Sequence, residues 1–201
     1  MKKTTRIISA LLAIAMLFSL TGCISNAKKA EQEVSKVMES VRSVDLDTIN
    51  SYFNDTLDED LDLDDPTAQL ILTTIFSNIN YNIISSEEID EDTVNVKTEI
   101  TAIDMKPILA TFIKDALAYA FANAFSSSAS EEETEKKMTE LFTAAIENTE
   151  KVEKSVTVDI EVNKDAEGNW NVEAGDAFID AILGGLVSAL EDLGDSFNFA
   201  D

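Results

Sequence analysis

The strongest pattern in this sequence is Thr93-Val94-Asn95-Val96-Lys97-Thr98-Glu99-Ile100-Thr101-Ala102-Ile103, in which apolar and polar side chains alternate. Every second residue from Val94 to Ala102 lies on one face. The residues between them, Asn95, Lys97, Glu99 and Thr101, lie on the other face. Successive side chains of a β-strand point to opposite faces. The period of two therefore predicts a strand with one buried and one solvent-facing side.

Three other segments repeat this alternation. Residues 79–86 precede the central strand, and the acidic link 87–92 predicts a hairpin between the two. Residues 155–163 alternate in the same way, and a turn at 165–169 leads into a last strand at 170–174. The sequence thus predicts an antiparallel sheet of about four strands.

Helices are expected before, between and after these strands in the chain, because apolar residues recur there at spacings of three and four. Asp65-Pro66 looks like an N-cap followed by proline at the first helical position, which opens one of them. Ser126 to Ser130 would join two long helices between the second and third strands. The predicted helices span 30–43, 48–54, a segment beginning at 66, 107–125, 131–150 and 177–193.

The pattern as a whole predicts an α+β fold, a sheet packed with helices. A single domain over 30–193 is expected, with 107–150 as an inserted helical hairpin and 194–201 as a loose tail. The leading helix, Asp45-Leu46-Asp47, the meandering sheet and the strand Asn169-Trp170-Asn171-Val172 resemble the cystatin-like or nuclear-transport-factor-like fold, as found in small lipoproteins of Gram-positive bacteria. This resemblance implies a curved sheet around a helix, a shape that often encloses an apolar pocket. The 107–150 insertion departs from the simplest version of that fold.

The N-terminus has the layout of a signal peptide. Lys2, Lys3 and Arg6 form a basic head, and residues 7–20 form an apolar stretch shorter than the roughly 20 residues of a membrane-spanning helix. The next motif, Leu20-Thr21-Gly22-Cys23, resembles the lipobox of bacterial lipoproteins.

That resemblance implies cleavage between Gly22 and Cys23 and attachment of diacylglycerol to the Cys23 sulfur. Residues 1–22 would then be a cleaved signal peptide, and residues 23–29 a lipidated tether. Cys23 is the only cysteine, so it cannot form an intramolecular disulfide. The protein is expected on the outer, extracytoplasmic face of the cell membrane, held there through the lipid on Cys23.

The strong negative charge of the chain limits the classes of partner that it is expected to bind. Loss of Lys2, Lys3 and Arg6 with the signal peptide leaves 12 basic residues against 39 acidic ones. A surface this acidic repels nucleic acid and anionic headgroups, so no nucleic-acid partner is expected. Histidine is absent, which removes the side chain that most easily transfers protons near neutral pH. No cofactor is predicted.

The acidic run Asp58 to Asp65 was weighed as a calcium site, because hard cations need several oxygen ligands. Counted from Asp58, position six is Leu63 and position twelve is Gln69, where an EF-hand has glycine and glutamate. A solvated loop is the preferred interpretation, with weak divalent binding left open. No metal site is predicted.

Two hypotheses of function follow. The preferred one is a non-enzymatic binding or interaction module that holds a small apolar ligand or docks an envelope protein. The alternative is an enzyme with a carboxylate-based apolar pocket, in which a tyrosine would converge with a carboxylate. Asp104 and Asp180 adjoin apolar stretches, but a catalytic role for either is disfavoured. The tyrosines that could fill this role in the enzyme are Tyr52, Tyr81 and Tyr119. A second group of aromatic residues is interpreted as core rather than pocket lining: Trp170, Phe112, Phe121, Phe125, Phe142 and Phe178.

Overall fold

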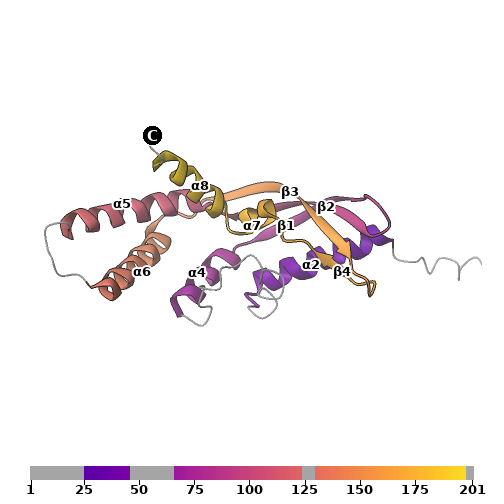
Figure 1. Ribbon diagram of the computed structural model, residues 1–201, viewed down its shortest axis with the longest axis horizontal. Coiled ribbons are helices and arrows are strands. Elements are labelled where there is room, and N and C mark those ends of the chain that lie inside the picture. Colours follow the sequence, from indigo (N-terminus) through magenta and orange to yellow (C-terminus); the bar gives the residue numbers. More distant parts are fainter. Residues whose placement is uncertain (1–24, 46–65, 124–129, 198–201) are drawn as a thin grey trace, which may run out of the picture.

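A computed structural model describes residues 25–45, 66–123 and 130–197 of the chain. These residues form an open, four-stranded antiparallel sheet packed with six helices, which confirms the predicted α+β class (Figure 1). In chain order the elements are α2 (Asn26–Arg42), α4 (Pro66–Phe76), β1 (Asn80–Glu88), β2 (Thr93–Ile103), α5 (Met105–Asn123), α6 (Glu131–Asn148), β3 (Glu153–Lys164), β4 (Trp170–Val172), α7 (Asp176–Ile182) and α8 (Leu186–Phe197).

The sheet is a simple meander, in the order β1-β2-β3-β4. β2 is paired along its full length with β3, from Thr93 opposite Asn163 to Ile103 opposite Glu153. The alternation predicted for β2 is confirmed, since the side chains of Val94, Val96, Thr98, Ile100 and Ala102 are all buried. β1 has a bulge at Ile84, where its register with β2 shifts.

α2 packs against the sheet through one apolar stripe. Its buried residues are Ala30, Val34, Val37, Met38 and Val41. The helix begins at Asn26, four residues before the predicted start, because the Ser25 hydroxyl accepts a hydrogen bond from the Lys28 backbone N–H and caps it. Its first turn is polar, which explains why apolar spacing alone did not show it.

α5 and α6 form a two-helix arm that projects from one end of the sheet (Figure 1). Phe112 and Phe142 meet edge to face across the arm, with ring centroids 5.3 Å apart. Ser130 and Glu133 form a capping box at the start of α6. α5 and α6 correspond to the helices predicted over 107–125 and 131–150.

The prediction of a single closing helix over 177–193 is wrong. The structure has two helices, α7 and α8, separated at Gly184 and Gly185, whose φ angles are +64° and +79°. These backbone conformations are left-handed and cannot continue a right-handed helix. α8 extends to Phe197, so residues 194–197 of the predicted loose tail are helical.

Four sequence predictions fall on residues outside those described: the signal peptide at 1–22, the helix at 48–54, the acidic loop at 58–65 and most of the joint at 126–130. The helix expected after Asp65 is confirmed as α4. Within the described parts of the chain, no helix combines the length and the apolar character needed to cross a bilayer, and this includes α5.

Replacement of Thr98 by valine is expected to stabilise the domain. Thr98 is fully buried, and its hydroxyl reaches only the Val96 carbonyl, at 3.5 Å. Valine has the same shape without the poorly bonded hydroxyl, so the free energy of unfolding should rise by about 1 kcal/mol. Urea unfolding followed by Trp170 fluorescence measures the change.

Thr101→Val is the matched control on the opposite face of β2. The Thr101 hydroxyl is 2.7 Å from the Ser155 hydroxyl, so this variant should lose stability. A loss of stability in Thr98→Val as well would contradict the expectation.

Candidate functional site

A polar groove of about 780 Å³ lies between α2 and β1 and opens broadly to solvent. α2 supplies its charged wall, because the polar side chains along one side of its buried stripe face this hollow. β1 supplies the other wall and is an edge strand of the described sheet. The charged and phenolic residues of the lining are Lys28, Glu31, Lys36, Glu39, Arg42 and Tyr81.

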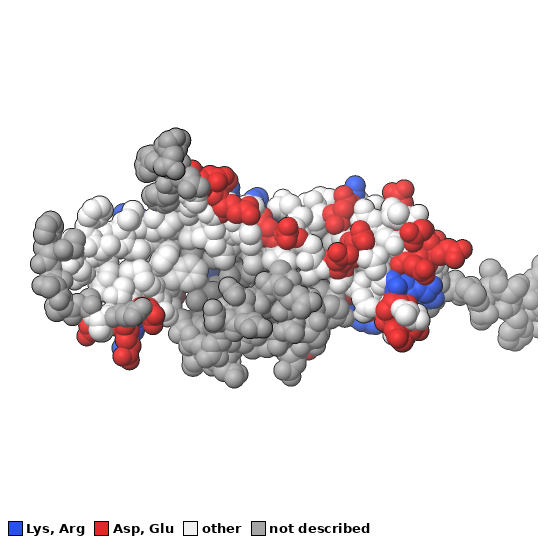
Figure 2. All heavy atoms as spheres, viewed as in Figure 1, with Lys and Arg blue, Asp and Glu red and all other residues white. Residues whose placement is uncertain are grey.

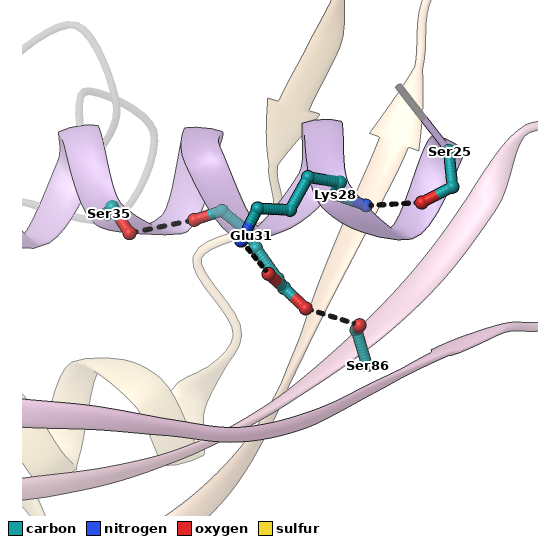
Figure 3. A network of polar contacts seen from close by, with 5 residues as sticks. All are labelled: Ser25, Lys28, Glu31, Ser35 and Ser86. Atoms are coloured by element: carbon teal, nitrogen blue, oxygen red, sulfur yellow. Dashed lines mark hydrogen bonds and ion pairs between the residues drawn. The ribbon is translucent and has the colours of Figure 1, made fainter. Parts of the chain in front are cut away.

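Glu31 is the centre of the polar network in this groove (Figure 3). Its carboxylate accepts hydrogen bonds from the Lys28 ammonium at 2.9 Å and the Ser86 hydroxyl at 2.7 Å. The hydrogen bond from Lys28, and then that from Ser86, lowers the pKa of Glu31 below its ordinary value of 4.5, against a smaller effect of burial. Glu31 is therefore held as the carboxylate, the opposite of what a general acid requires.

A second pairing lies further along the groove. The Tyr81 hydroxyl donates to the Glu39 carboxylate at 3.2 Å, and the Arg42 guanidinium lies 3.1 Å from the same oxygen. A tyrosine and a carboxylate thus converge, as the enzyme hypothesis requires. The surrounding groove, however, is polar and open, whereas that hypothesis requires an apolar pocket that would raise the pKa of a carboxyl group.

Glu31→Gln is expected to destabilise the domain at neutral pH but not in acid. Because folding lowers the pKa of Glu31, its contribution to stability is present above the unfolded pKa and is lost as the pH falls through the folded one. The difference in melting temperature between wild type and variant should therefore shrink steadily below pH 4.5. Melting curves between pH 3 and pH 8 measure it.

Ser86→Ala provides an independent check, because it removes one of the two hydrogen bonds that lower the pKa of Glu31. This variant should show the same trend with a smaller amplitude. A difference that stayed constant across the pH range would mean that the ionisation of Glu31 does not contribute to stability.

Asp104 and Asp180 both stabilise helix starts. Asp104 accepts a hydrogen bond from the Lys106 backbone N–H at 3.1 Å, in the first turn of α5. Asp180 accepts from the backbone N–H and the hydroxyl of Ser188, at 3.0 and 2.6 Å, beside the break between α7 and α8. Asp180 also borders an acidic hollow of about 680 Å³ that includes Asp159 and Asp176. Among the described residues, no cluster of carboxylates has metal-site geometry.

Four of the six aromatic residues predicted for the core lie in it or pack, partly buried, against it. Phe178 and Trp170 are buried, and Phe112 and Phe142 pack on each other. Phe121 is the exception and corrects the prediction, because 72% of it is exposed on α5. Tyr119 is half-buried on the same helix, and Gly22, Cys23, Tyr52 and Phe125 lie outside the described residues.

The exposed face of α5 was missed by the sequence analysis. Apolar spacing alone cannot show how many neighbours a helix has. In a two-helix arm, α5 packs mainly on α6 and cannot bury apolar residues on every side. The signal that could have revealed this is the lack of a polar face on α5, which is apolar around most of its circumference.

These features define the class as an α+β domain with an open antiparallel meander and a helical arm. The chain belongs to the family described as a domain of unknown function (DUF5105), whose sequence profile matches residues 30–187. No curated protein sequence matches it. It is similar to a Bacillus subtilis protein whose crystal structure is described as that of a "putative lipoprotein (ycdA)", with 16% identity and a TM-score of 0.42. That match covers 73% of this chain and 46% of the other.

Proposed function

We propose that this protein is an exported, lipid-anchored lipoprotein that acts as a non-enzymatic interaction module on the outer face of the cell membrane, with a protein of the envelope as its partner. The motif Leu20-Thr21-Gly22-Cys23 supports the anchor. The position of α2 indicates which part of the domain would lie next to the membrane. Only Ile24 and Ser25 separate Cys23 from the first residue of α2, a reach of about 10 Å at full extension.

The proposal rests mainly on where the anchor would be attached, which is at one end of an elongated domain. The start of α2 is tied to the β1–β2 turn, because Asn26 donates to the Glu91 carbonyl at 3.3 Å and the Ala27 N–H donates to the Glu88 carboxylate at 3.1 Å. The arm begins at the other end of β2. In Figure 1 the start of α2 and the arm accordingly lie at opposite ends of the longest axis.

Charge supports an upright orientation on the membrane. The β1–β2 turn carries Asp90, Glu91 and Asp92, preceded by Glu87 and Glu88. Figure 2 shows carboxylates crowded around a smaller group of lysine or arginine side chains at this end of the molecule. Anionic headgroups repel such a surface, which favours an orientation in which the long axis leads away from the bilayer. The arm is then presented to the surroundings.

The state of the groove supports a non-enzymatic role. Glu31 and Glu39 are engaged by cations and hydroxyls, and the Glu31 pKa is lowered. We further propose that the domain is of the cystatin-like or nuclear-transport-factor-like kind, supported by a leading helix packed along one face of an antiparallel meander.

Mass spectrometry of the protein extracted from membranes tests the anchor. The N-terminal peptide is expected to begin at Cys23, to lack residues 1–22 and to carry the mass of diacylglycerol. A free Cys23 thiol, or retention of residues 1–22, would overturn it. A thermal-shift screen against lipids and metabolites tests the non-enzymatic role. A stabilising metabolite that the protein also converts would contradict that role.

A further inference from the structure

The described part of α5 exposes a continuous face with an unusual composition. Its exposed residues are Lys106, Ala110, Lys114, Leu117, Ala118, Ala120, Phe121 and Ala122, all of them apolar or lysine. Leu117 is 47% exposed and Phe121 72%. They are one helical turn apart, so the two side chains lie on the same side of the helix. Exposed apolar surface of this kind marks interaction sites when it is contiguous.

The charge of this face contrasts with that of the rest of the chain. The sequence contains 39 acidic residues, yet none of the exposed residues of α5 is acidic, and Asp115, the one acidic residue of this helix, is half-buried. Lys106 pairs with Asp192 of α8 at 3.0 Å, whereas Lys114 forms no ion pair with any described residue. In Figure 2 most of the described arm surface is white, and the charged side chains visible on it are mainly acidic and lie toward α6. The face therefore complements an apolar partner surface that carries negative charge.

The exposed face of α5 lies far from the proposed anchor, and therefore far from the bilayer. β2 has 11 residues and spans about 33 Å between the anchor end and the base of the arm. The helix from Met105 to Phe121 adds about 24 Å. In the upright orientation, Phe121 lies tens of ångströms from the headgroups. A second copy of the chain docked through the same face is also disfavoured, because the exposed residues of α5 are apolar or lysine and supply no carboxylate to the lysines of the other copy.

We infer that the exposed face of α5, centred on Leu117 and Phe121 with Lys114 beside them, docks an amphipathic helix of an envelope protein that carries acidic residues next to its apolar stripe. The bound helix would pack along α5 as a third helix of the arm. Its carboxylates would pair with Lys114. This inference rests on the proposed anchor only for the position of the arm relative to the membrane.

Photocross-linking in cells that produce the full chain tests it. Ala118 is replaced by p-benzoylphenylalanine, which places the reactive group between Leu117 and Phe121 and leaves both intact. The expected product is an adduct with another protein. Mass spectrometry should map the cross-link to an amphipathic segment with acidic residues beside its apolar positions. Leu117→Ser combined with Phe121→Ser should reduce the adduct roughly tenfold or more, because such residues dominate interface energies.

Two further variants sharpen the result. Lys114→Glu should also reduce the adduct, because it reverses the charge that the partner meets. Ile89→Ser is the matched control, since Ile89 is an exposed apolar residue at the opposite end of the molecule, and it should leave the adduct unchanged. Adducts with lipid or with a second copy, a cross-linked segment without acidic residues, or no adduct would each overturn the inference. Failure of the anchor appears separately, in the mass of the N-terminal peptide.

Discussion

Cys23→Ser is expected to move the protein from the membrane fraction to the soluble fraction and to abolish incorporation of labelled fatty acid. Serine lacks the sulfur that would carry diacylglycerol. Each buried methylene of an acyl chain contributes about 0.8 kcal/mol, and one short chain gives only marginal binding, so two long chains account for stable attachment.

Ser25→Ala is the control for this experiment. It removes the cap of α2, at a cost of about 1 kcal/mol, and leaves Cys23 in place. This variant should remain in the membrane fraction and still incorporate lipid. If Cys23→Ser also remained there with label attached, Cys23 would not be the site of anchoring.

Gly184→Ala is expected to cause the largest loss of stability among substitutions of one small residue by another. A Cβ atom at this position would lie 1.9 Å from the backbone oxygen of Ile103, and the φ angle of +64° disfavours any side chain. The Gly184 carbonyl also accepts the Met105 N–H at 3.0 Å, so neither backbone can move without losing this bond. The cost should be about 4 kcal/mol or more. Urea unfolding followed by Trp170 fluorescence measures it.

Gly168→Ala separates backbone strain from collision. Gly168 has a φ angle of +88°, but a Cβ atom there would have nothing within 4 Å. Strain alone should cost about 1 to 2 kcal/mol. Equal losses in the two variants would show that the collision with Ile103 is relieved by movement of the chain and adds nothing.

The elements with local signals were predictable. β2 was predicted with its observed bounds, because its alternation of apolar and polar residues is unbroken. α4 was signalled by Asp65-Pro66 at its start. The division between α7 and α8 was not predicted, because apolar residues continue at helical spacing through Leu183, Leu186 and Val187 on both sides of the glycine pair. The break is made by the left-handed conformations of Gly184 and Gly185, and the close approach of Gly184 to the backbone of Ile103, far away in the sequence, leaves no room for a side chain there.

The groove between α2 and β1 could not be predicted, because sequence patterns do not show which distant residues come into contact. Glu31 meets Ser86 across 55 residues, and Tyr81 meets Glu39 across 42. Both contacts require the position of α2 on the sheet, which is set by tertiary packing. The exposure of Phe121 had the same cause, since the sequence shows that α5 is apolar but not that it stands in an arm with few neighbours.

The bulge at Ile84 has a consequence for a protein anchored to a membrane in the way proposed above. Molecules tethered to one plane collide far more often than molecules free in three dimensions, and an uninterrupted edge strand offers each neighbour a row of unpaired amides and carbonyls. The shift of register at Ile84 interrupts that row in the middle of β1. Deletion of Ile84 would restore a regular edge. If the protein is anchored as proposed, the variant should form β-rich aggregates at high density on the membrane, while dilute protein in detergent remains monomeric.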